Sequence, residues 1–314
     1  MYLNKKISVV MATYNGEKYF KEQIDSILNQ SIKPDEILIC DDRSSDQTID
    51  IVNEYIGYDN IICLYCNERN MGYTMNFLNG AKRSSGDIVF LSDQDDIWDK
   101  YKIEHMLEVL EKHPEILVLS CGYDLIDGNG NPLKSKHTWK KNAGSVKAIK
   151  WDDFIKRPAN VPGMSLAIKR EIINSIELDT IRPSLAHDWL INEIAAYHKG
   201  LFKLSEILVH YRQHGNNAVG VVTNYTLDNL LKARLKILNG YYNIHCYLQE
   251  KYCDKPEIVS KMEKLKSIDE QRKKNVDEKR IMKWFLLYIR NYNLLSFFNY
   301  CGDGVTILKL LYSR

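Results

Sequence analysis

The first hundred residues alternate between short apolar runs and segments whose apolar residues recur at helical spacing. The runs predict four strands, at residues 7–12, 36–42, 61–66 and 87–92. The segments between them predict helices at residues 19–28, 45–56 and 74–83, and a fourth helix is expected at 100–112. Strands that are buried on both faces and joined by helices are typical of a parallel sheet. We therefore predict an α/β fold with a mostly parallel central sheet flanked by helices.

Polar side chains gather directly after each of the four strands. They are Thr13, Tyr14 and Asn15; Asp41 and Asp42; residues 67–70; and residues 93–96. In open α/β sheets, ligands bind outside the carboxyl ends of the strands. One polar loop would say little, because loops are generally polar. Four in succession predict a single binding crevice.

The segment after the fourth strand is strongly acidic. Asp93, Asp95, Asp96 and Asp99 fall within seven residues, and a divalent cation would neutralise such a cluster. Mg²⁺ or Mn²⁺ is commonly bound by one or two carboxylates together with substrate phosphates. An Asp-x-Asp at a strand end could hold such a cation against a diphosphate. Alternatively, Asp95 or Asp96 caps the helix that follows, and the two roles are compatible.

Several function classes fit poorly. The first strand is not followed by GxGxxG, and the chain has no GxxxxGK[ST], which argues against a Rossmann dehydrogenase and a P-loop hydrolase. An aspartyl-phosphate phosphatase normally ends its first strand in a nucleophilic aspartate, where this chain has Ala12, Thr13 and Tyr14. A net charge of +2 does not support bulk binding of nucleic acid, so no nucleic-acid partner is expected.

The second half of the chain has a mixed pattern. A short helix is expected at 151–156, a turn into a strand at 161–170, a helix at 187–199 and one or two strands at 201–214. From about residue 224 the chain becomes helical and charged, and residues 261–280 suggest a solvated helix. We predict a catalytic domain at 1–220 and a helical C-terminal region at 221–314.

Six segments in order carry a family resemblance. They are VVMATYNGEKYFKEQIDSILNQS, ILICDDRSSDQT, NMGYTMNF, FLSDQDDIW, HDW and YRQHGNNAVG. Together they resemble glycosyltransferase family 2 over about residues 5–220, and SDQDDIW, HDW and YRQH are especially similar to bacterial rhamnosyltransferases of cell-wall and surface polysaccharide synthesis. The resemblance implies an A-type nucleotide-sugar fold, a metal-dependent site and inversion at the anomeric carbon.

The resemblance also implies a nucleotide site. It puts Thr13, Tyr14 and Asn15 beside the base and ribose, with Thr13 and Tyr14 in contact with the nucleotide. Asp42 would accept a hydrogen bond from the pyrimidine N3–H. Asn70 belongs to a loop near the base.

The diphosphate and its cation would be bound by residues from two distant segments. The resemblance puts Asp93 near the ribose and the metal, and makes Asp95 a ligand of Mn²⁺ or Mg²⁺. Asp96 is expected to be a cap or a neighbouring group. From its position before a Gly-Asn-Asn turn, His214 could be a further metal ligand or diphosphate contact, and Arg212 could meet phosphate oxygens. Either residue could instead have a purely structural role.

Transfer also requires that the acceptor hydroxyl lose its proton. The resemblance makes Asp188 the general base, although chemistry asks only for a carboxylate or a histidine within reach. Without the resemblance, a helix N-cap is an equally good interpretation of Asp188. Trp189 could offer an apolar face to an acceptor sugar or belong to the core.

The expected activity is inverting, metal-dependent transfer of a sugar to a growing, lipid-linked cell-surface polysaccharide. The motif similarity favours dTDP-rhamnose as donor, and a UDP-hexose (glucose, galactose or N-acetylhexosamine) is the second choice. The chain lacks the Gln-x-x-Arg-Trp of processive polymerases, which favours single additions. Two other classes stay open, a metal-dependent phosphotransferase and a non-catalytic glycan-binding scaffold.

The end of the chain, residues 281–314, is aromatic and apolar with basic flanks. This composition suits an interfacial helix on an anionic membrane surface. The competing interpretation is packing against the catalytic domain, or a contact in a homodimer. Family acceptors are commonly carried on a polyprenyl diphosphate. The expected location is therefore cytoplasmic, peripheral on the inner face of the plasma membrane.

Overall fold

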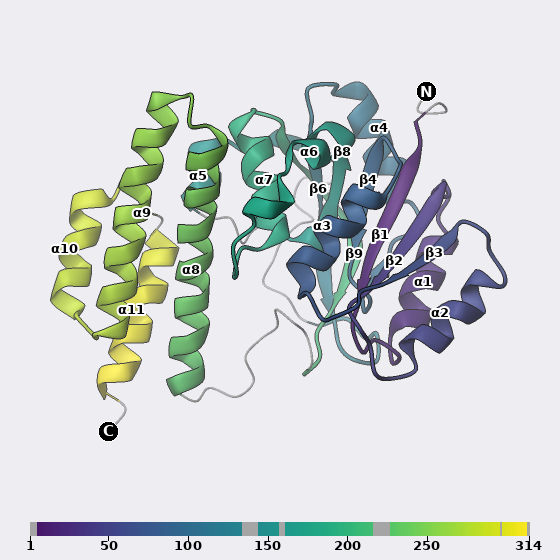
Figure 1. The fold of residues 1–314 in the computed structure, drawn as a ribbon, viewed down its shortest axis with the longest axis horizontal. Helices are drawn as coiled ribbons and strands as arrows, with labels where there is room; N and C mark the ends of the chain where they lie inside the picture. The colour runs from purple at the N-terminus through teal and green to yellow at the C-terminus, as the bar shows by residue number, and fades with distance from the viewer. Residues whose placement is uncertain (1–4, 134–143, 157–160, 216–226, 296, 313–314) are drawn as a thin grey trace. The chain divides into compact units, whose positions relative to one another are not determined.

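A computed structural model describes residues 5–133, 144–156, 161–215, 227–295 and 297–312 (Figure 1). The chain divides into two compact units. The first, here called the sheet unit, consists of Met1–Trp151, Ala159–Leu178 and Ile191–Gly220. The second, here called the helical unit, consists of Asp152–Pro158, Asp179–Leu190 and Val221–Arg314.

This division differs from the single boundary after residue 220 that the sequence suggested. Two segments from the earlier part of the chain belong to the helical unit, and a side chain of each forms an ion pair within it. Arg182 forms an ion pair with Glu250. The Nζ of Lys261 lies 2.5 Å from Oδ1 of Asp152. A helical pattern along the sequence does not reveal such long-range pairs.

The sheet unit is built on one mixed sheet. Its strands are β1 (Ile7–Thr13), β2 (Glu36–Asp41), β3 (Ile62–Cys66), β4 (Ile88–Ser92), β5 (Ile97–Trp98), β6 (Val118–Ile126), β7 (Val146–Ala148), β8 (Leu166–Lys169) and β9 (Leu201–Arg212). Their order is β3-β2-β1-β4-β8-β6-β9-β5, and β7 pairs with β9. The strands β3, β2, β1 and β4 are mutually parallel, which confirms the predicted α/β core. Strand β8 runs antiparallel to both β4 and β6.

Helices cover both faces of this sheet. They are α1 (Phe20–Leu28), α2 (Thr48–Ile56), α3 (Tyr73–Arg83), α4 (Lys102–Lys112) and α6 (Arg170–Ser175). Alternate residues of a strand face opposite sides, so Val9 and Met11 enter a core shared with α1 and α4, while Val10 faces α3. Helix α3 approaches β1 closely at Gly80, where an added Cβ would lie 2.6 Å from Cγ1 of Val10. The carboxyl ends of the central strands are left for the loops that form the site.

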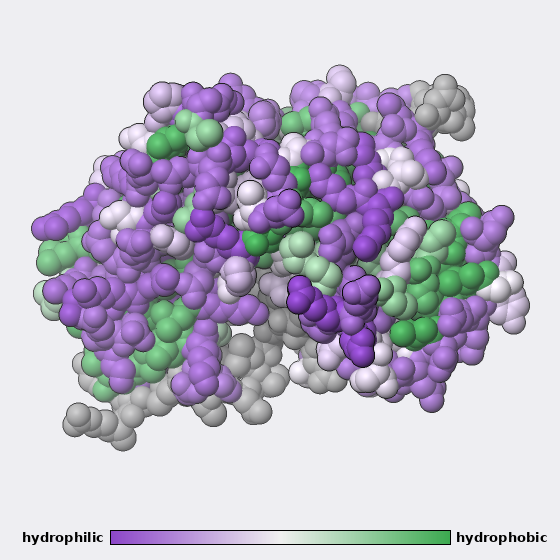
Figure 2. Space-filling view, viewed as in Figure 1, coloured by the Kyte–Doolittle hydropathy of each residue, from purple (hydrophilic) through white to green (hydrophobic). Residues whose placement is uncertain are grey.

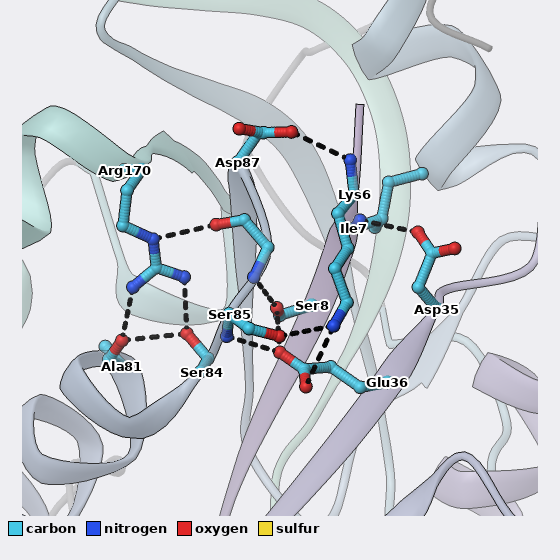
Figure 3. Close-up of polar contacts among 11 residues, drawn as sticks. Lys6, Ile7, Ser8, Asp35, Glu36, Ala81, Ser84, Ser85, Asp87 and Arg170 are labelled. Carbon is cyan, nitrogen blue, oxygen red and sulfur yellow. Dashed lines mark hydrogen bonds and ion pairs between the residues drawn. The ribbon is translucent and has the colours of Figure 1, made fainter. Parts of the chain in front are cut away.

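The amino ends of β1, β2 and β4 are closed by a polar network (Figure 3). The Oγ of Ser8 donates to Glu36 and accepts a hydrogen bond from the backbone N–H of Gly86 at 2.7 Å. Arg170 donates from Nε to the carbonyl of Gly86 at 2.7 Å and from Nη2 to Oγ of Ser84 at 2.8 Å. This network satisfies polar groups at the end of the sheet opposite the candidate site.

The helical unit is dominated by four helices. They are α8 (Leu227–Lys251), α9 (Pro256–Asp277), α10 (Ile281–Asn291) and α11 (Phe297–Tyr312), with most of the short α5 (Trp151–Lys156). Leu238, Tyr241, Val276 and Ile307 form an apolar core. The prediction of a solvated helix at 261–280 was incomplete, because α9 buries one face that includes Asp269 and Arg272.

Both buried charges of α9 are paired. Nη1 of Arg272 lies 3.2 Å from Asp269, and its Nε lies 2.8 Å from Asp303 on α11. The Nδ1 of His245 on α8 lies 2.8 Å from the other oxygen of Asp269. None of the described helices combines the length with the apolar character of a membrane-spanning segment.

Candidate active site

The loops after β4 and β9 meet through an imidazole and a carboxylate. The Nε2 of His214 lies 2.8 Å from Oδ2 of Asp95, and both side chains are mostly buried. Burial raises the pKa of the Asp95 carboxyl, and the hydrogen bond and charge of His214 oppose that rise. The ring of Tyr19 packs 4.7 Å from the His214 ring. Two residues that the sequence predicted as metal ligands are thus in direct contact.

Arg212 holds the loops after β4 and β9 in place through hydrogen bonds. Its side chain is fully buried, and Nε donates to the carbonyl of Asp95 at 2.7 Å. Nη2 donates to Oε2 of Glu22 at 2.6 Å, and Nη1 donates to the carbonyl of Gly128 at 3.2 Å. With its guanidinium occupied inside the protein, Arg212 positions the acidic loop in this arrangement. Its side chain has no exposed surface in this structure, and the predicted contact of Arg212 with phosphate oxygens stays a prediction.

Asp96 is buried among charges. Its Oδ1 accepts from the backbone N–H of Arg212 at 3.0 Å, and its Oδ2 has no hydrogen-bond partner within the described residues. Burial, followed by the charges of Asp95 and Asp93, raises the pKa of Asp96 well above its usual value. The predicted capping of the following helix by Asp95 or Asp96 is wrong. Helix α4 begins after Tyr101, which forms no side-chain cap.

A buried lysine lies beneath the acidic loop. Nζ of Lys102 donates to the carbonyl of Met164 at 2.7 Å and lies 3.5 Å from the ring centroid of Trp98. Burial lowers the pKa of Lys102 to about 8, while nearby acids, including Asp96 and Asp93, favour its charged form. The lysine therefore supplies part of the positive charge that the acids require.

The acidic loop supplies some, but not all, of the ligands that a cation would need. Asp95 offers a carboxylate and His214 an imidazole, but no three His, Cys, Asp or Glu side chains of the described residues are arranged as metal ligands. Sites for Mg²⁺ usually combine one or two carboxylates with water and substrate phosphates. The unpartnered oxygen of Asp96 and the mutual repulsion of the acids are both compatible with added positive charge. The residues thus fit a cation whose coordination a bound diphosphate would complete.

The carboxyl ends of β1 and β2 are joined by Thr13 and Asp41. The buried hydroxyl of Thr13 donates to Oδ2 of Asp41 at 2.8 Å, and the backbone N–H of Ser44 donates to Oδ1 at 2.7 Å. Thr13 therefore holds the two strand ends together, a role that the sequence did not predict.

Gln94 clamps the loop after β1. Its Oε1 accepts from the backbone N–H of Tyr14 at 2.8 Å, and its Nε2 donates to the Tyr14 carbonyl at 3.0 Å. The Tyr14 side chain is half exposed and available to a ligand. A Cβ on Gly16 would lie 2.2 Å from Oε1 of Gln94, so the glycine makes room for the clamp. Gln94 was missed because an amide in a polar loop carries no local signal.

Asn15 connects the same loop to the segment after β2. It has a left-handed φ of 48°, and its Oδ1 accepts from the backbone N–H of Ser45 at 2.8 Å. Its own N–H donates to Oγ of Ser44 at 2.9 Å. The predicted contact of Asn15 with ribose or base stays a prediction.

Asp42 organises the loop after β3. Its carboxylate accepts from Nδ2 of Asn67 at 2.9 Å and from the backbone N–H groups of Met71 and Gly72 at 2.7 and 2.8 Å. Nδ2 of Asn70 donates to the Asp42 carbonyl at 3.2 Å. A carboxylate has about four acceptor positions, so these three bonds leave one position unused on this buried side chain. The predicted bond to a pyrimidine stays untested.

Asp188 and Trp189 belong to the helical unit. They lie in the first turn of α7 (His187–Tyr197), where Oδ1 of the half-buried Asp188 accepts from the Trp189 backbone N–H at 2.8 Å. The Trp189 ring packs 5.1 Å from the ring of Tyr241, next to Gly240. Trp189 is thus largely a packing residue here, and both predicted roles, base and acceptor contact, stay predictions.

Within the sheet unit, the structure places the predicted residues at the carboxyl ends of strands that run in the same direction. At the ends of β1, β2 and β3 they are Thr13, Tyr14, Asn15, Asp42 and Asn70, and at the ends of β4 and β9 they are Asp93, Asp95, Arg212 and His214. A family model for glycosyl transferase family 2 matches residues 8–174, which contain most of these positions. The chain belongs to glycosyl transferase family 2.

Named relatives agree with this family, and a solved structure shares the fold. The putative teichuronic acid biosynthesis glycosyltransferase TuaG of Bacillus subtilis is 28% identical over 213 residues, 67% of this chain and 80% of that protein. The dTDP-rhamnosyl transferase RfbG of Shigella flexneri is 29% identical over 224 residues, 67% of this chain and 73% of that protein. The crystal structure of S. aureus TarS 1-349 in complex with UDP-GlcNAc has a TM-score of 0.58 at 18% identity, covering 98% of this chain and 93% of that one. This last likeness shows a shared fold.

For a family 2 glycosyltransferase, the geometry assigns structural tasks that the family motifs alone did not. Residues of the family motifs form hydrogen bonds to other parts of the protein. Asp42 binds a backbone loop, Thr13 binds Asp41, and Arg212 binds the carbonyl of Asp95. A motif residue can therefore be needed for the shape of the site without touching the substrate.

Proposed function

We propose that this family 2 glycosyltransferase transfers a single sugar, with inversion, from a nucleoside diphosphate donor to a growing cell-surface polysaccharide. The observation that carries the proposal is the contact between Asp95 and His214 at the strand ends where the nucleotide loops also converge. This is the edge at which an α/β sheet binds a nucleotide, and it offers ligands for the cation that a diphosphate needs.

The donor's nucleoside would lie along the loops after β1 and β2. The exposed ring of Tyr14 can stack on or contact the nucleoside because Gln94 holds its backbone at both the N–H and the carbonyl. Asp42 has an acceptor position left for a pyrimidine N–H. Preorganised loops limit the entropy that is lost when the donor binds.

The diphosphate would lie over the acidic loop. Asp95 and His214, with Asp93, would hold Mn²⁺ or Mg²⁺, and such a cation supplies charge stabilisation to the leaving nucleoside diphosphate. Arg212 keeps the loop in place by binding the carbonyl of Asp95 and, through its own N–H, the carboxylate of Asp96.

In the transfer step, Asp188 would accept the proton of the acceptor hydroxyl. The acceptor oxygen forms a bond to the anomeric carbon as the bond from that carbon to the diphosphate oxygen breaks. The nucleoside diphosphate departs with the bonding electrons, and attack from the opposite side inverts the configuration. A carboxylate on the first turn of a helix is a suitable base if it lies within hydrogen-bond reach of the nucleophile.

We propose dTDP-rhamnose as the donor and a lipid-linked glycan as the acceptor. The similarity to a dTDP-rhamnosyl transferase supports this donor, and the similarity to a teichuronic acid enzyme supports a cell-wall polysaccharide acceptor. A UDP-hexose is the second candidate, because the similar TarS fold was solved with UDP-GlcNAc.

Calorimetric titration of nucleoside diphosphate sugars, first with Mn²⁺ and then with EDTA, tests the proposal. We expect dTDP-rhamnose to bind only with the metal, and Asp95→Asn to weaken that binding at least tenfold. Asp50→Asn removes an exposed carboxylate from α2 and should bind like the native chain. Preferential binding of UDP-sugars would change the donor, and failure of every nucleotide sugar to bind would overturn the catalytic proposal.

A further inference from the structure

Helix α10 has apolar side chains on its exposed face, where a helix at the protein surface normally has polar ones. Leu287 is buried within the helical unit. On the other side, Met282, Phe285, Leu286 and Ile289 are 68%, 47%, 46% and 51% exposed. Their spacing of i, i+3, i+4 and i+7 makes one continuous stripe along the helix. Figure 2 shows apolar residues at the left edge of the molecule, where Figure 1 places α10.

Helix α11, which packs against α10, has a similar stripe. Val305, Leu308 and Leu311 recur at every third position and are all exposed. The two helices approach closely at Gly304, where a Cβ would lie 2.2 Å from the Trp284 ring. Both helices therefore combine a packed side with an apolar exposed side.

The exposed charges along these stripes are basic. Lys283 and Arg290 are exposed on α10, seven residues apart and therefore on one flank of the stripe, and Lys309 is exposed on α11. Neither α10 nor α11 has an exposed acid among the described residues, since Asp303 is buried and paired with Arg234 and Arg272.

We propose that the exposed faces of α10 and α11 bind the surface of an anionic lipid bilayer. Met282, Phe285 and Ile289 would enter the boundary between headgroups and acyl chains, while Lys283 and Arg290 would meet lipid phosphates. An amphipathic helix with aromatic and aliphatic residues on one side and basic residues on its flank binds in this way, lying in the plane of the interface. Basic side chains near an anionic leaflet add to the binding.

Charge favours a bilayer over a second copy of the chain. A symmetric contact between two copies presents the same patch to itself. It would bring Lys283 and Arg290 together with their own counterparts, and the described residues of α10 and α11 offer no exposed acid to pair with them. An anionic bilayer satisfies both the apolar stripe and its basic flank.

Flotation of the full-length chain with lipid vesicles tests the proposal. We expect binding to vesicles that contain phosphatidylglycerol and at least tenfold weaker binding to pure phosphatidylcholine. The double variant Phe285→Ser/Ile289→Ser should lose at least tenfold in binding to the anionic vesicles. Lys283→Gln/Arg290→Gln should weaken binding by a similar factor and reduce its dependence on salt. The matched control is Tyr58→Ser, which removes an exposed aromatic residue (91% exposed) of the sheet unit and should change nothing.

Three results would overturn the inference. They are failure of the native chain to float with anionic vesicles, unchanged binding by Phe285→Ser/Ile289→Ser, and a dimer in sedimentation velocity that this variant dissociates while lipid binding is absent. The substituted side chains are exposed, so melting temperatures should stay close to the native value. Calorimetric donor binding by the same variants should be unchanged, which separates a failure of this inference from a failure of the proposed transferase activity.

Discussion

The backbone N–H of Arg212 donates to Oδ1 of Asp96 at 3.0 Å, which joins the end of β9 to the acidic loop after β4. The side chain of Arg212 adds a second link between the two segments, because its Nε donates to the carbonyl of Asp95. One residue thus restrains both the backbone and an acidic side chain of the proposed diphosphate site. The arrangement makes Arg212 a positioning residue.

Arg212→Met should therefore destabilise the protein as well as the site. Its buried guanidinium satisfies the carbonyls of Asp95 and Gly128, and leaving buried acceptors without donors costs about 1–3 kcal/mol each. We expect a loss of about 2–4 kcal/mol in the free energy of unfolding, measured by urea denaturation. Glu22→Gln removes the charge of a carboxylate that is half exposed, and should cost under about 1 kcal/mol. Equal stability of the two variants would show that Arg212 does not hold this loop.

Gly16→Ala should weaken donor binding through Gln94. The new Cβ would lie 2.2 Å from Oε1 of Gln94 and would displace the amide from both of its bonds to the Tyr14 backbone. Because φ of Gly16 is not in the left-handed region, the alanine is not strained by the backbone. We expect KM for the donor to rise about tenfold, the equivalent of about 1.4 kcal/mol.

The double variant Gly16→Ala/Gln94→Ala tests whether Gly16→Ala acts by displacing Gln94 from the Tyr14 backbone or independently of Gln94. If the clamp of Gln94 on Tyr14 matters, Gln94→Ala alone should raise KM by a similar factor, and adding Gly16→Ala should raise it no further. Additive losses would mean that Gly16 acts independently of Gln94.

The parallel half of the sheet was predictable because β1, β2 and β4 are apolar runs that bury both faces, while β3 is an apolar run that stays largely exposed. Strand β6 was not predicted, since Ser120, Gly122 and Asp124 interrupt its apolar pattern and its stability comes from pairing with β8 and β9. The acidic cluster identified the proposed cation site without structural help. The burial of Arg212 could not be predicted, because Glu22, one of its partners, is 190 residues away in the sequence. Local patterns report periodicity and composition, whereas such a contact depends on the finished fold.

His214→Gln tests the imidazole beside Asp95. Glutamine can still donate a hydrogen bond to the carboxylate, but it replaces the imidazole nitrogen as a metal donor. If His214 helps to hold the cation, the concentration of Mn²⁺ needed for half-maximal donor binding should rise at least tenfold. In His105→Gln, a matched change at a histidine that contacts Glu206 on another part of the sheet unit, the requirement should not change. An unchanged metal requirement in His214→Gln would leave His214 with a purely structural role.

Asp188→Asn tests the proposed base. The amide is similar in size to the carboxylate and can still accept a hydrogen bond from the Trp189 N–H, so the first turn of α7 should be preserved. Without a basic carboxylate, kcat for transfer should fall at least a hundredfold, in line with the usual contribution of general base catalysis of about 10²–10⁴. Calorimetric donor binding should stay within about twofold of the native value. Normal turnover by this variant would exclude Asp188 as the base.

His187, the residue before that aspartate, predicts a dependence of stability on pH. Burial lowers the pKa of His187 to about 3, from an ordinary value of 6.5. Below the ordinary value, the unfolded chain binds a proton that the folded chain does not accept until pH approaches the folded pKa. The contribution of His187 therefore falls as pH decreases through this window, by about 1.4 kcal/mol per pH unit. Between about pH 7 and pH 5 the native chain should lose about 2 kcal/mol more unfolding free energy than His187→Leu. Urea denaturation at both pH values measures the difference, and parallel losses in the two proteins would mean that His187 is not responsible.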